Sequence, residues 1–204
     1  MRALVALLLA LLASSAVAQW PGGQNAMLVG GGAACTTTLA TTTNMTVGTN
    51  MAYSAGVFTP TNPSANAASR NSTAIGGDFY FTVTFGAANQ VNNIGIFSSA
   101  ELATFSTSAG DGVGGMASMT NSFYWRVIGG TDGIYKGGSS VGTPGDYANN
   151  DVVLFRRVGS TITVEKNGSV VLTYGVGSGA DMYVAMGNDN GRTIASASAV
   201  GWCK

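Results

Sequence analysis

The sequence predicts an all-β protein whose single domain is an antiparallel β-sandwich, and three observations support this fold class. Short runs of β-branched and aromatic residues recur about every ten residues, separated by Gly, Asn, Ser and Thr. Glycine accounts for 30 of the 204 residues, about twice its usual share, as expected for a chain with many tight turns. Beyond the N-terminal 18 residues, no window keeps a helical period. Two packed sheets bury such strands most simply.

The N-terminal 18 residues have the features of a secretory signal peptide. Arg2 precedes an apolar run over residues 3–12, and Ala16-Val17-Ala18 fits the small-residue cleavage rule, so we expect cleavage near Ala18 and export. The run is shorter than the roughly 20 residues that span a bilayer, and no later run is longer, so we expect no membrane span in the mature chain. We expect an N-terminal segment with the first strand over residues 19–44, and the sandwich domain over residues 45–204.

The chain has two cysteines, Cys35 near the predicted mature N-terminus and Cys203 near the other end of the sequence. Disulfides form and persist in exported proteins, so we expect these two residues to be joined. A bridge requires the two terminal strands to be neighbours, with Cα atoms about 4.4–6.8 Å apart. Two free thiols, or one intermolecular bridge, are the alternatives.

The strands can be assigned along the chain. Residues 36–50 are rich in Thr, which permits a strand without specifying one, and residues 59–64 are expected to form a loop. The clearest strand, Phe79–Phe85, alternates so that its three phenylalanines and its valine share one face. Trp125 falls in a predicted strand and is expected in the core. Further strands are predicted at Asn93–Phe97, Phe123–Val127, Gly133–Lys136, Asp151–Arg157, Thr161–Lys166, Ser169–Tyr174, Asp181–Met186 and Thr193–Gly201.

The sharpest local signal is a hairpin around Asn167-Gly168. These two residues tolerate positive φ, as the type I′ turn of a two-residue hairpin loop requires. The turn would pair Lys166 with Ser169. Counting on from that pair places Val164 opposite Val171.

The composition excludes several kinds of chemistry. The chain has no His, so it has no Ser-His-Asp or Cys-His relay and no His-ligated metal. Its nine basic and nine acidic residues balance, and no basic stripe for nucleic acid is present. Its two glutamates are Glu101, expected in a loop, and Glu165, expected to be solvated at a hairpin end. No pair of carboxylates is placed for glycoside hydrolysis, so we expect a protein without catalytic activity.

Asn-rich turns raise two further candidates. Residues 188–191 and 149–151 offer oxygen ligands of the kind calcium accepts, but they lack the spacing of a calcium loop. Ordinary Asx turns explain them more simply, so no metal and no other cofactor is predicted. N-glycosylation motifs start at Asn44, Asn71 and Asn167, which matters only in a host that glycosylates.

The order of five motifs resembles a known family. The motifs read Gly77-Asp78-Phe79-Tyr80-Phe81-Thr82-Val83, then Ile94-Gly95-Ile96-Phe97-Ser98, Tyr147-Ala148-Asn149-Asn150-Asp151-Val152-Val153, residues 159–168 and Met182-Tyr183-Val184-Ala185-Met186. Together they resemble the concanavalin A-like sandwich, a jelly-roll, and within it the SPRY-type domains. Residues 51–58 resemble, more weakly, an opening strand of that family. The resemblance covers roughly residues 45–200.

This resemblance implies a binding fold, found in lectins, adhesion proteins and protein-recognition modules. It therefore implies a secreted binding or adhesion module that recognises a glycan or a surface protein. In this fold, ligands bind on loops at one end or on a concave sheet face. The candidate binding residues on turn-rich segments are Tyr135, Tyr147, Asn188, Asp189 and Arg192. The alternatives are a self-assembling subunit of a surface layer, filament or phage particle and, less favoured, a glycoside hydrolase or lyase of the same superfamily.

Overall fold

The computed structural model describes residues 37–39, 41, 43–54, 57–62, 67–85, 93–107, 115–126, 133–145, 148, 150–176, 179–188 and 197–204. The predicted signal peptide and Cys35 lie outside these residues, as do Tyr147, Asp189 and Arg192. Within the described ranges, no helix is both long and apolar enough to cross a membrane.

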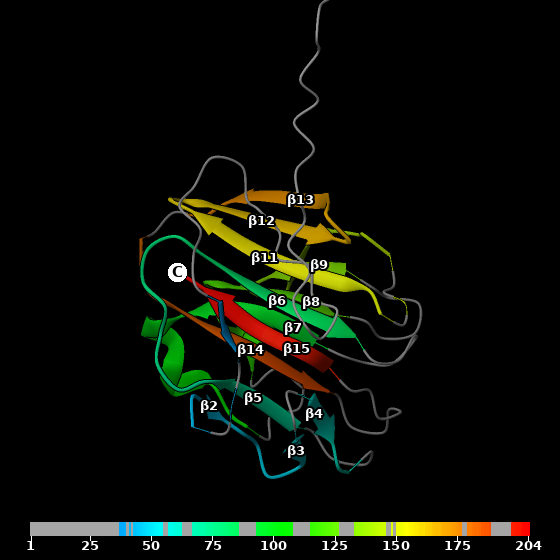
Figure 1. Ribbon diagram of the computed structural model, residues 1–204. Helices are drawn as coiled ribbons and strands as arrows, with labels where there is room; N and C mark the ends of the chain where they lie inside the picture. Colours follow the sequence, from blue (N-terminus) through cyan, green and yellow to red (C-terminus); the bar gives the residue numbers. More distant parts are fainter. Residues whose placement is uncertain are drawn as a thin grey trace, which may run out of the picture. The chain divides into compact units, whose positions relative to one another are not determined.

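The described strands form two sheets, and every strand pairing in them is antiparallel, as the sequence predicted (Figure 1). The first sheet has the order β13-β12-β11-β6-β15-β4-β3, and β1 also pairs with β15. Its strands are β1 (Thr37–Leu39), β3 (Met51–Ser54), β4 (Val57–Pro60), β6 (Phe79–Phe85), β11 (Val152–Val158), β12 (Thr161–Lys166), β13 (Ser169–Gly175) and β15 (Ala197–Cys203).

The second sheet lies behind the first in the view of Figure 1 and has the order β10-β9-β8-β7-β14-β5-β2. Two short 3-10 helices, η1 (Ser99–Thr104) and η2 (Met116–Ser118), follow β7 and precede β8. The strands are β2 (Met45–Thr46), β5 (Ala67–Asn71), β7 (Asn93–Ser98), β8 (Ser122–Arg126), β9 (Gly133–Lys136), β10 (Ser139–Gly142) and β14 (Met182–Asn188).

The core lies between the two sheets and follows the predicted alternation. On β6, Phe79, Phe81 and Val83 are buried, whereas the residues between them are partly exposed. Phe155 of β11 pairs with Phe81. The second sheet contributes Trp125, which is fully buried as predicted. Burial of each such side chain contributes about 1.5–3 kcal/mol to folding, so this layer supplies much of the stability.

The hairpin at Asn167-Gly168 confirms the predicted turn but not the full register. Both residues have positive φ, 51° and 79°, and Lys166 pairs with Ser169. Beyond that pair a β-bulge shifts the register, so Val164 lies opposite Leu172 and the predicted pairing with Val171 is wrong. The bulge has a physical reason, because it lets both Val171 and Leu172 pack against the core.

Two expectations for the N-terminal half are corrected. Residues 51–58 form parts of two paired strands, β3 and β4, rather than one strand. Thr59 and Pro60, expected in a loop, complete β4 by pairing with Ala52 and Met51. A proline fits there because Pro60 is the last residue of β4, and the neighbouring strand β15 pairs with β4 at Phe58 and not at Pro60.

A second apolar cluster lies on the outer face of the second sheet, away from the main core. It contains Phe97, Met116, Met119, Tyr124, Tyr183 and Ala185. Phe105, just after η1, stacks on Phe97 with ring centroids 5.1 Å apart, and Phe97 stacks on Tyr183 at 5.3 Å. The segments that contain η1 and η2 therefore cover part of this face.

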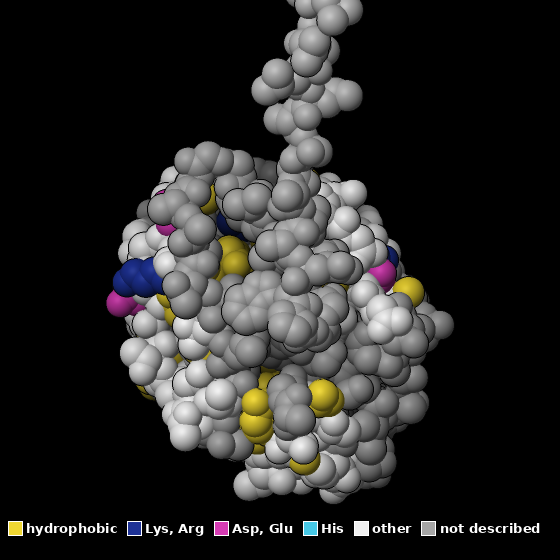
Figure 2. All heavy atoms as spheres, in the orientation of Figure 1, with side chains coloured by type: hydrophobic (Ala, Val, Ile, Leu, Met, Phe, Trp, Pro, Cys, Tyr) yellow, Lys and Arg dark blue, Asp and Glu magenta, His cyan; other side chains and the backbone are white. Residues whose placement is uncertain are grey.

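The described surface carries few charges. Among the coloured side chains of the face in Figure 2, dark-blue and magenta atoms are sparse. Large exposed apolar side chains are scattered rather than clustered, with Val158 and Val170 exposed by 55% and 60%. Single exposed apolar residues of this kind are normal on a protein surface and need no special explanation.

Candidate functional site

The structure does not bring the described candidate residues together. Tyr135 lies on β9, half-buried, and stacks on Tyr124 with centroids 5.4 Å apart and planes within 13°. It is therefore part of the cluster on the outer face of the second sheet. Asn188 is the last residue of β14. Tyr147, Asp189 and Arg192 fall outside the described residues.

A groove of about 450 Å³ opens instead at the end of the sandwich where β6 and β14 begin and β15 ends. Asn188 lies at the far end of β14, six residues from Met182, which at about 3.3 Å per residue is about 20 Å away. The groove is lined by Thr38, Thr43, Asn44, Ser72, Thr73, Ala74, Ile75, Gly76, Trp202 and Lys204.

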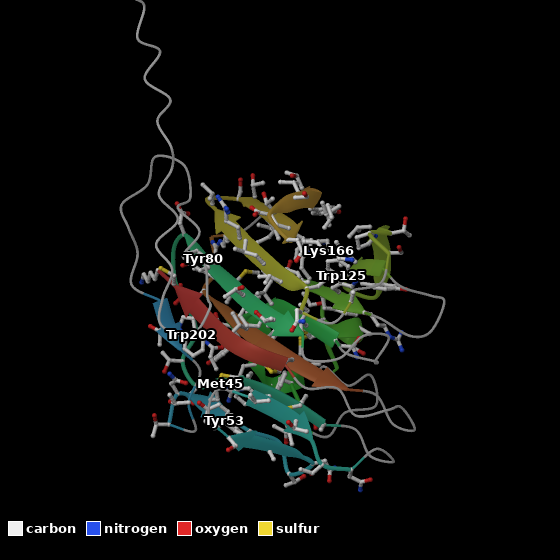
Figure 3. The ribbon with its side chains drawn as sticks, turned by 45° about the vertical axis from the view of Figure 1, so that its right-hand side comes forward. Met45, Tyr53, Tyr80, Trp125, Lys166 and Trp202 are labelled. Atoms are coloured by element: carbon white, nitrogen blue, oxygen red, sulfur yellow. The ribbon has the colours of Figure 1, made fainter. Side chains whose placement is uncertain are left out.

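Trp202 forms the aromatic wall of the groove. It lies on β15 (Figure 3), where it pairs with Thr38 of β1 on one side and with Phe81 of β6 on the other. The side chain is half-buried and packs against the main core, while the rest of its surface lines the groove. The core therefore fixes the ring and leaves part of its surface open, an arrangement that suits stacking against a ligand.

The opposite wall is residues 72–76, which we call the ledge. Its backbone is tied at both ends, because the Ser72 N–H donates to the Asn44 carbonyl at 2.8 Å and Ile75 forms a β-bridge with Met182. In that bridge, each backbone N–H donates to the other residue's carbonyl, at 2.7 and 2.9 Å. The ledge is therefore held to both β14 and the turn before β2.

Two residues of β5 fix the start of the ledge. Asn71 is fully buried, and its Nδ2 donates to the Thr73 carbonyl while its Oδ1 accepts from the Val184 N–H. Arg70 points to the outer face, where its guanidinium lies 4.8 Å from the centroid of Tyr183 and donates to the Asn71 carbonyl at 2.7 Å. A wall fixed in this way costs little ordering entropy when a ligand binds.

Sequence reasoning missed this groove. Trp202 and Trp125 are both aromatic residues within strands, and no local signal separates the one that lines a groove from the one that is buried. The ledge consists mostly of small residues, typical of an ordinary turn. The ledge is placed by contacts between segments that are distant in sequence, among them the isolated β-bridge between Ile75 and Met182.

The two glutamates lie far apart in the fold. Glu101, expected in a loop, lies on η1, which covers the outer face of the second sheet, and it accepts from the Asn121 N–H at 3.0 Å. Glu165 lies on β12 in the first sheet, on the outward side because its neighbour Val164 faces the core. Both sheets therefore separate the two carboxylates, so they form no pair of the kind that glycosidases use.

The expectation that Glu165 is solvated is wrong. The residue is 6% exposed, and its Oε1 lies 2.9 Å from Nη2 of Arg156 on the adjacent strand. The partner explains the burial, because a carboxylate is removed from water readily only when it is paired and hydrogen-bonded.

The Asn-rich turn before β11 is held together by Asp151. Its two carboxylate oxygens accept from the Ala148 N–H and the Asn167 amide, and Lys166 Nζ lies 3.0 Å from Oδ2. Burial raises the pKa of Asp151, but these three donors outweigh burial and hold the pKa below its usual value. In the part of the chain that the structure describes, no cluster of three or more Asp, Glu, Cys or His residues is placed to hold a metal.

The three glycosylation motifs differ in access. Asn71 is buried with both amide atoms engaged, so it is closed to modification in the folded protein. Asn167 is exposed at its turn, although its amide contacts Asp151 and Val152. Asn44 is partly exposed and its Oδ1 accepts from the Thr41 N–H.

The predicted clasp between the terminal strands is supported in part by strand pairing. Cys203 is 1% exposed and pairs with Thr37 of β1, two residues after Cys35. Cys35 itself lies outside the described residues, so the disulfide stays a prediction.

No protein-family model and no curated protein matches the chain. Several solved structures, in contrast, match the chain in fold. The SPRY domain of human HERC1 superposes with a TM-score of 0.57 at 13% identity, over 79% of this chain and 95% of that chain. The exoplasmic/lumenal domain of VIP36, in a Ca2+/Man-bound form, gives 0.57 at 9% identity, over 79% and 82%. The apo Crh5 transglycosylase gives 0.54 at 12% identity, over 84% of each chain.

These likenesses confirm the predicted fold. The chain is a concanavalin A-like sandwich of the kind seen in SPRY and legume lectin-like domains. At such low identity they establish the architecture alone, and function has to be argued from the site.

Proposed function

We propose that this concanavalin A-like sandwich is a secreted, non-catalytic binding or adhesion module that recognises carbohydrate or a surface partner through the groove at Trp202. The observation that carries the proposal is the aromatic wall facing a fixed ledge of hydroxyl and backbone groups. Saccharides present both apolar C–H faces and hydroxyls, so they need one aromatic surface and several well-placed polar groups.

The solved structures support a binding role. They include the Ca2+/Man-bound domain of VIP36 and the carbohydrate recognition domain of Emp46p, the latter with a TM-score of 0.54 at 8% identity. Both are built on the same sandwich, which is therefore a scaffold that can present a saccharide site. Secretion rests on the signal peptide predicted over residues 1–18, and mass spectrometry of the exported protein should find cleavage near Ala18.

The absence of catalysis is part of the proposal, and the likeness to Crh5 makes it worth testing. Glu101 and Glu165 are separated by both sheets, and Glu165 is held by Arg156. We expect purified protein to release no reducing ends from mixed polysaccharides. If the wild-type protein releases reducing ends and a Glu101→Gln or Glu165→Gln variant does not, this part of the proposal is overturned.

A glycan array with the purified protein tests the binding role directly. We expect a defined set of glycans to bind, and Trp202→Ala to remove the binding. Tyr135→Ala is the matched control, because Tyr135 is also aromatic and half-buried but lies on the outer face of the second sheet. If Tyr135→Ala abolishes binding and Trp202→Ala does not, the binding site lies at Tyr135, as the sequence analysis predicted. Size-exclusion chromatography that finds one large assembly without glycan binding would favour the structural-subunit alternative.

A further inference from the structure

The charges around the groove balance. Among the described residues that line it, Lys204 alone is charged. On the other side, the Asp181 carboxylate lies beside Gly76, since a Cβ built on that glycine would come within 2.6 Å of Oδ1. Arg70 lies on the outer face of the second sheet, where it stacks on Tyr183 and donates to ledge-side carbonyls. The described part of the groove therefore presents about one charge of each sign, and no cluster of either.

The ledge is also poorly suited to an anion. Anion sites in loops are built from backbone N–H groups that converge on the ligand. Here the N–H groups of Ser72 and Ile75 already donate to the carbonyls of Asn44 and Met182. A phosphate or carboxylate at these two positions would have to displace these bonds, and it would lie close to the Asp181 carboxylate.

What the groove does offer is a neutral surface. The indole of Trp202 provides an apolar face, and the hydroxyls of Thr38, Ser72 and Thr73 make no hydrogen bond within the described residues. Its volume of about 450 Å³ falls in the range of small-molecule sites. These features match a ligand that is rich in hydroxyls and carries no net charge.

We infer that the groove selects neutral saccharides over uronic acids, phosphorylated sugars and nucleotides. One sugar ring stacks on Trp202 and its hydroxyls meet the ledge, while Lys204 and Asp181 contribute little to affinity. The inference rests on the proposed function, since it names the class of ligand for the same site.

Isothermal titration with matched pairs of oligosaccharides tests the inference, for example galactotetraose against tetragalacturonate and mannotetraose against tetramannuronate. We expect a neutral member to bind and its acidic partner to bind at least about tenfold more weakly, a difference of about 1.4 kcal/mol. Because neutral ligands release no counterions and meet no screened charge, affinity should change less than about twofold between 20 and 500 mM NaCl.

Variants separate the contributions of the aromatic ring, the ledge hydroxyls and the positive charges to the affinity. Trp202→Ala should weaken the neutral ligand about tenfold or more, and Trp202→Phe, which keeps an aromatic face and the core contact, should retain part of the affinity. Ser72→Ala removes one ledge hydroxyl from an exposed residue without disturbing the core. Lys136→Gln, on the distant β9, is the control for the loss of a positive charge and should leave neutral binding unchanged within about twofold.

The outcomes distinguish the inference from the proposed function. Acidic partners that bind equally well or more tightly, or a steep loss of affinity with salt, would overturn the preference for neutral ligands and leave saccharide binding intact. Binding to no saccharide of either kind would overturn the proposed function itself.

Discussion

The backbone N–H of Val184 donates to Oδ1 of Asn71 at 2.9 Å, across 113 residues of sequence. Both groups are buried, and the other end of the same amide donates to the Thr73 carbonyl of the ledge. One side chain thus joins the middle of β14 to the wall of the groove. The position of the ledge depends on this amide as much as on its own backbone bonds.

Asn71→Ala should destabilise the protein and loosen the ledge together. The change leaves the buried Val184 N–H and the Thr73 carbonyl without their partner, at about 1–3 kcal/mol for each group left unpaired. Urea unfolding measures the loss in the free energy of unfolding. Ser72→Ala, at an exposed neighbouring position, is the control, and its free energy of unfolding should stay within about 0.5 kcal/mol of the wild type. Equal stability of the two variants would contradict the role given to Asn71.

Gly95→Ala should be among the most damaging single-methyl additions in the chain. A Cβ at this position would lie 2.2 Å from the Phe123 carbonyl oxygen and 2.5 Å from the Tyr124 Cβ, both on the adjacent strand β8. Backbone must move to relieve the contact, so we expect a loss of about 3 kcal/mol or failure to fold. Gly175→Ala is the control, because nothing lies within 4 Å of its built Cβ. Thermal melting of both variants should separate them clearly.

The pair formed by Arg156 and Glu165 should be strongly coupled. Removal of Glu165 leaves a guanidinium that is only 21% exposed without its carboxylate, so Glu165→Ala should cost about 1–3 kcal/mol. Replacing both residues at once, with Arg156→Met and Glu165→Leu, should recover most of that loss, because two apolar side chains need no ionic partner. A double-mutant cycle by chemical denaturation measures the coupling, and additive effects would show that the pair contributes little.

The stability of the protein should fall in acid through Asp151. Its pKa in the folded protein lies below the usual value, so the carboxylate contributes stability that is fully present above the unfolded-state pKa of about 4. That contribution is lost as pH falls from about 4 through the lower folded-state pKa. Asp151→Asn should be less stable near pH 7 and should show a weaker dependence on pH below about 4. Unfolding curves at several pH values test this, and parallel curves for the two proteins would contradict it.

Thiol chemistry tests the predicted link between Cys35 and Cys203. We expect no reaction with a maleimide after the unreduced protein is unfolded, and two reacted thiols after reduction. Two reacted thiols before reduction would leave the cysteines free. A dimer on a non-reducing gel would identify the bridge as intermolecular.

Most of the strand pattern could be predicted because strands with one buried face alternate in sequence. The Phe79–Phe85 and Thr161–Lys166 strands are found at their predicted bounds. β5, with the sequence Ala-Ala-Ser-Arg-Asn, was not predicted, because it lacks β-branched and aromatic residues and is held by its neighbours β14 and β2. The bulge at Val164 was missed as well, since it depends on how two side chains of β13 pack and not on the turn.

The site could be predicted far less well than the fold. Sequence reasoning favoured aromatic and Asx residues in turns, whereas the groove uses a tryptophan inside a strand and a ledge whose useful groups are hydroxyls and backbone atoms. Such a surface forms only where β15 and the ledge come together in the fold. These two segments are far apart in sequence, so no local sequence pattern predicts that they are neighbours. Glu165 illustrates the same difficulty, because its burial depends on Arg156 of the adjacent strand.

The position of β15 has a consequence for how the protein is made. This strand, Ala197–Cys203, lies inside the first sheet between β6 and β4, which come from the first half of the chain. During synthesis, the earlier strands emerge before β15, so the edges of β6 and β4 that pair with β15 are still unpaired. Until residue 203 has emerged, other chains can pair with those edges. A chaperone that delays the collapse of the chain would therefore protect it from aggregation before β15 is available.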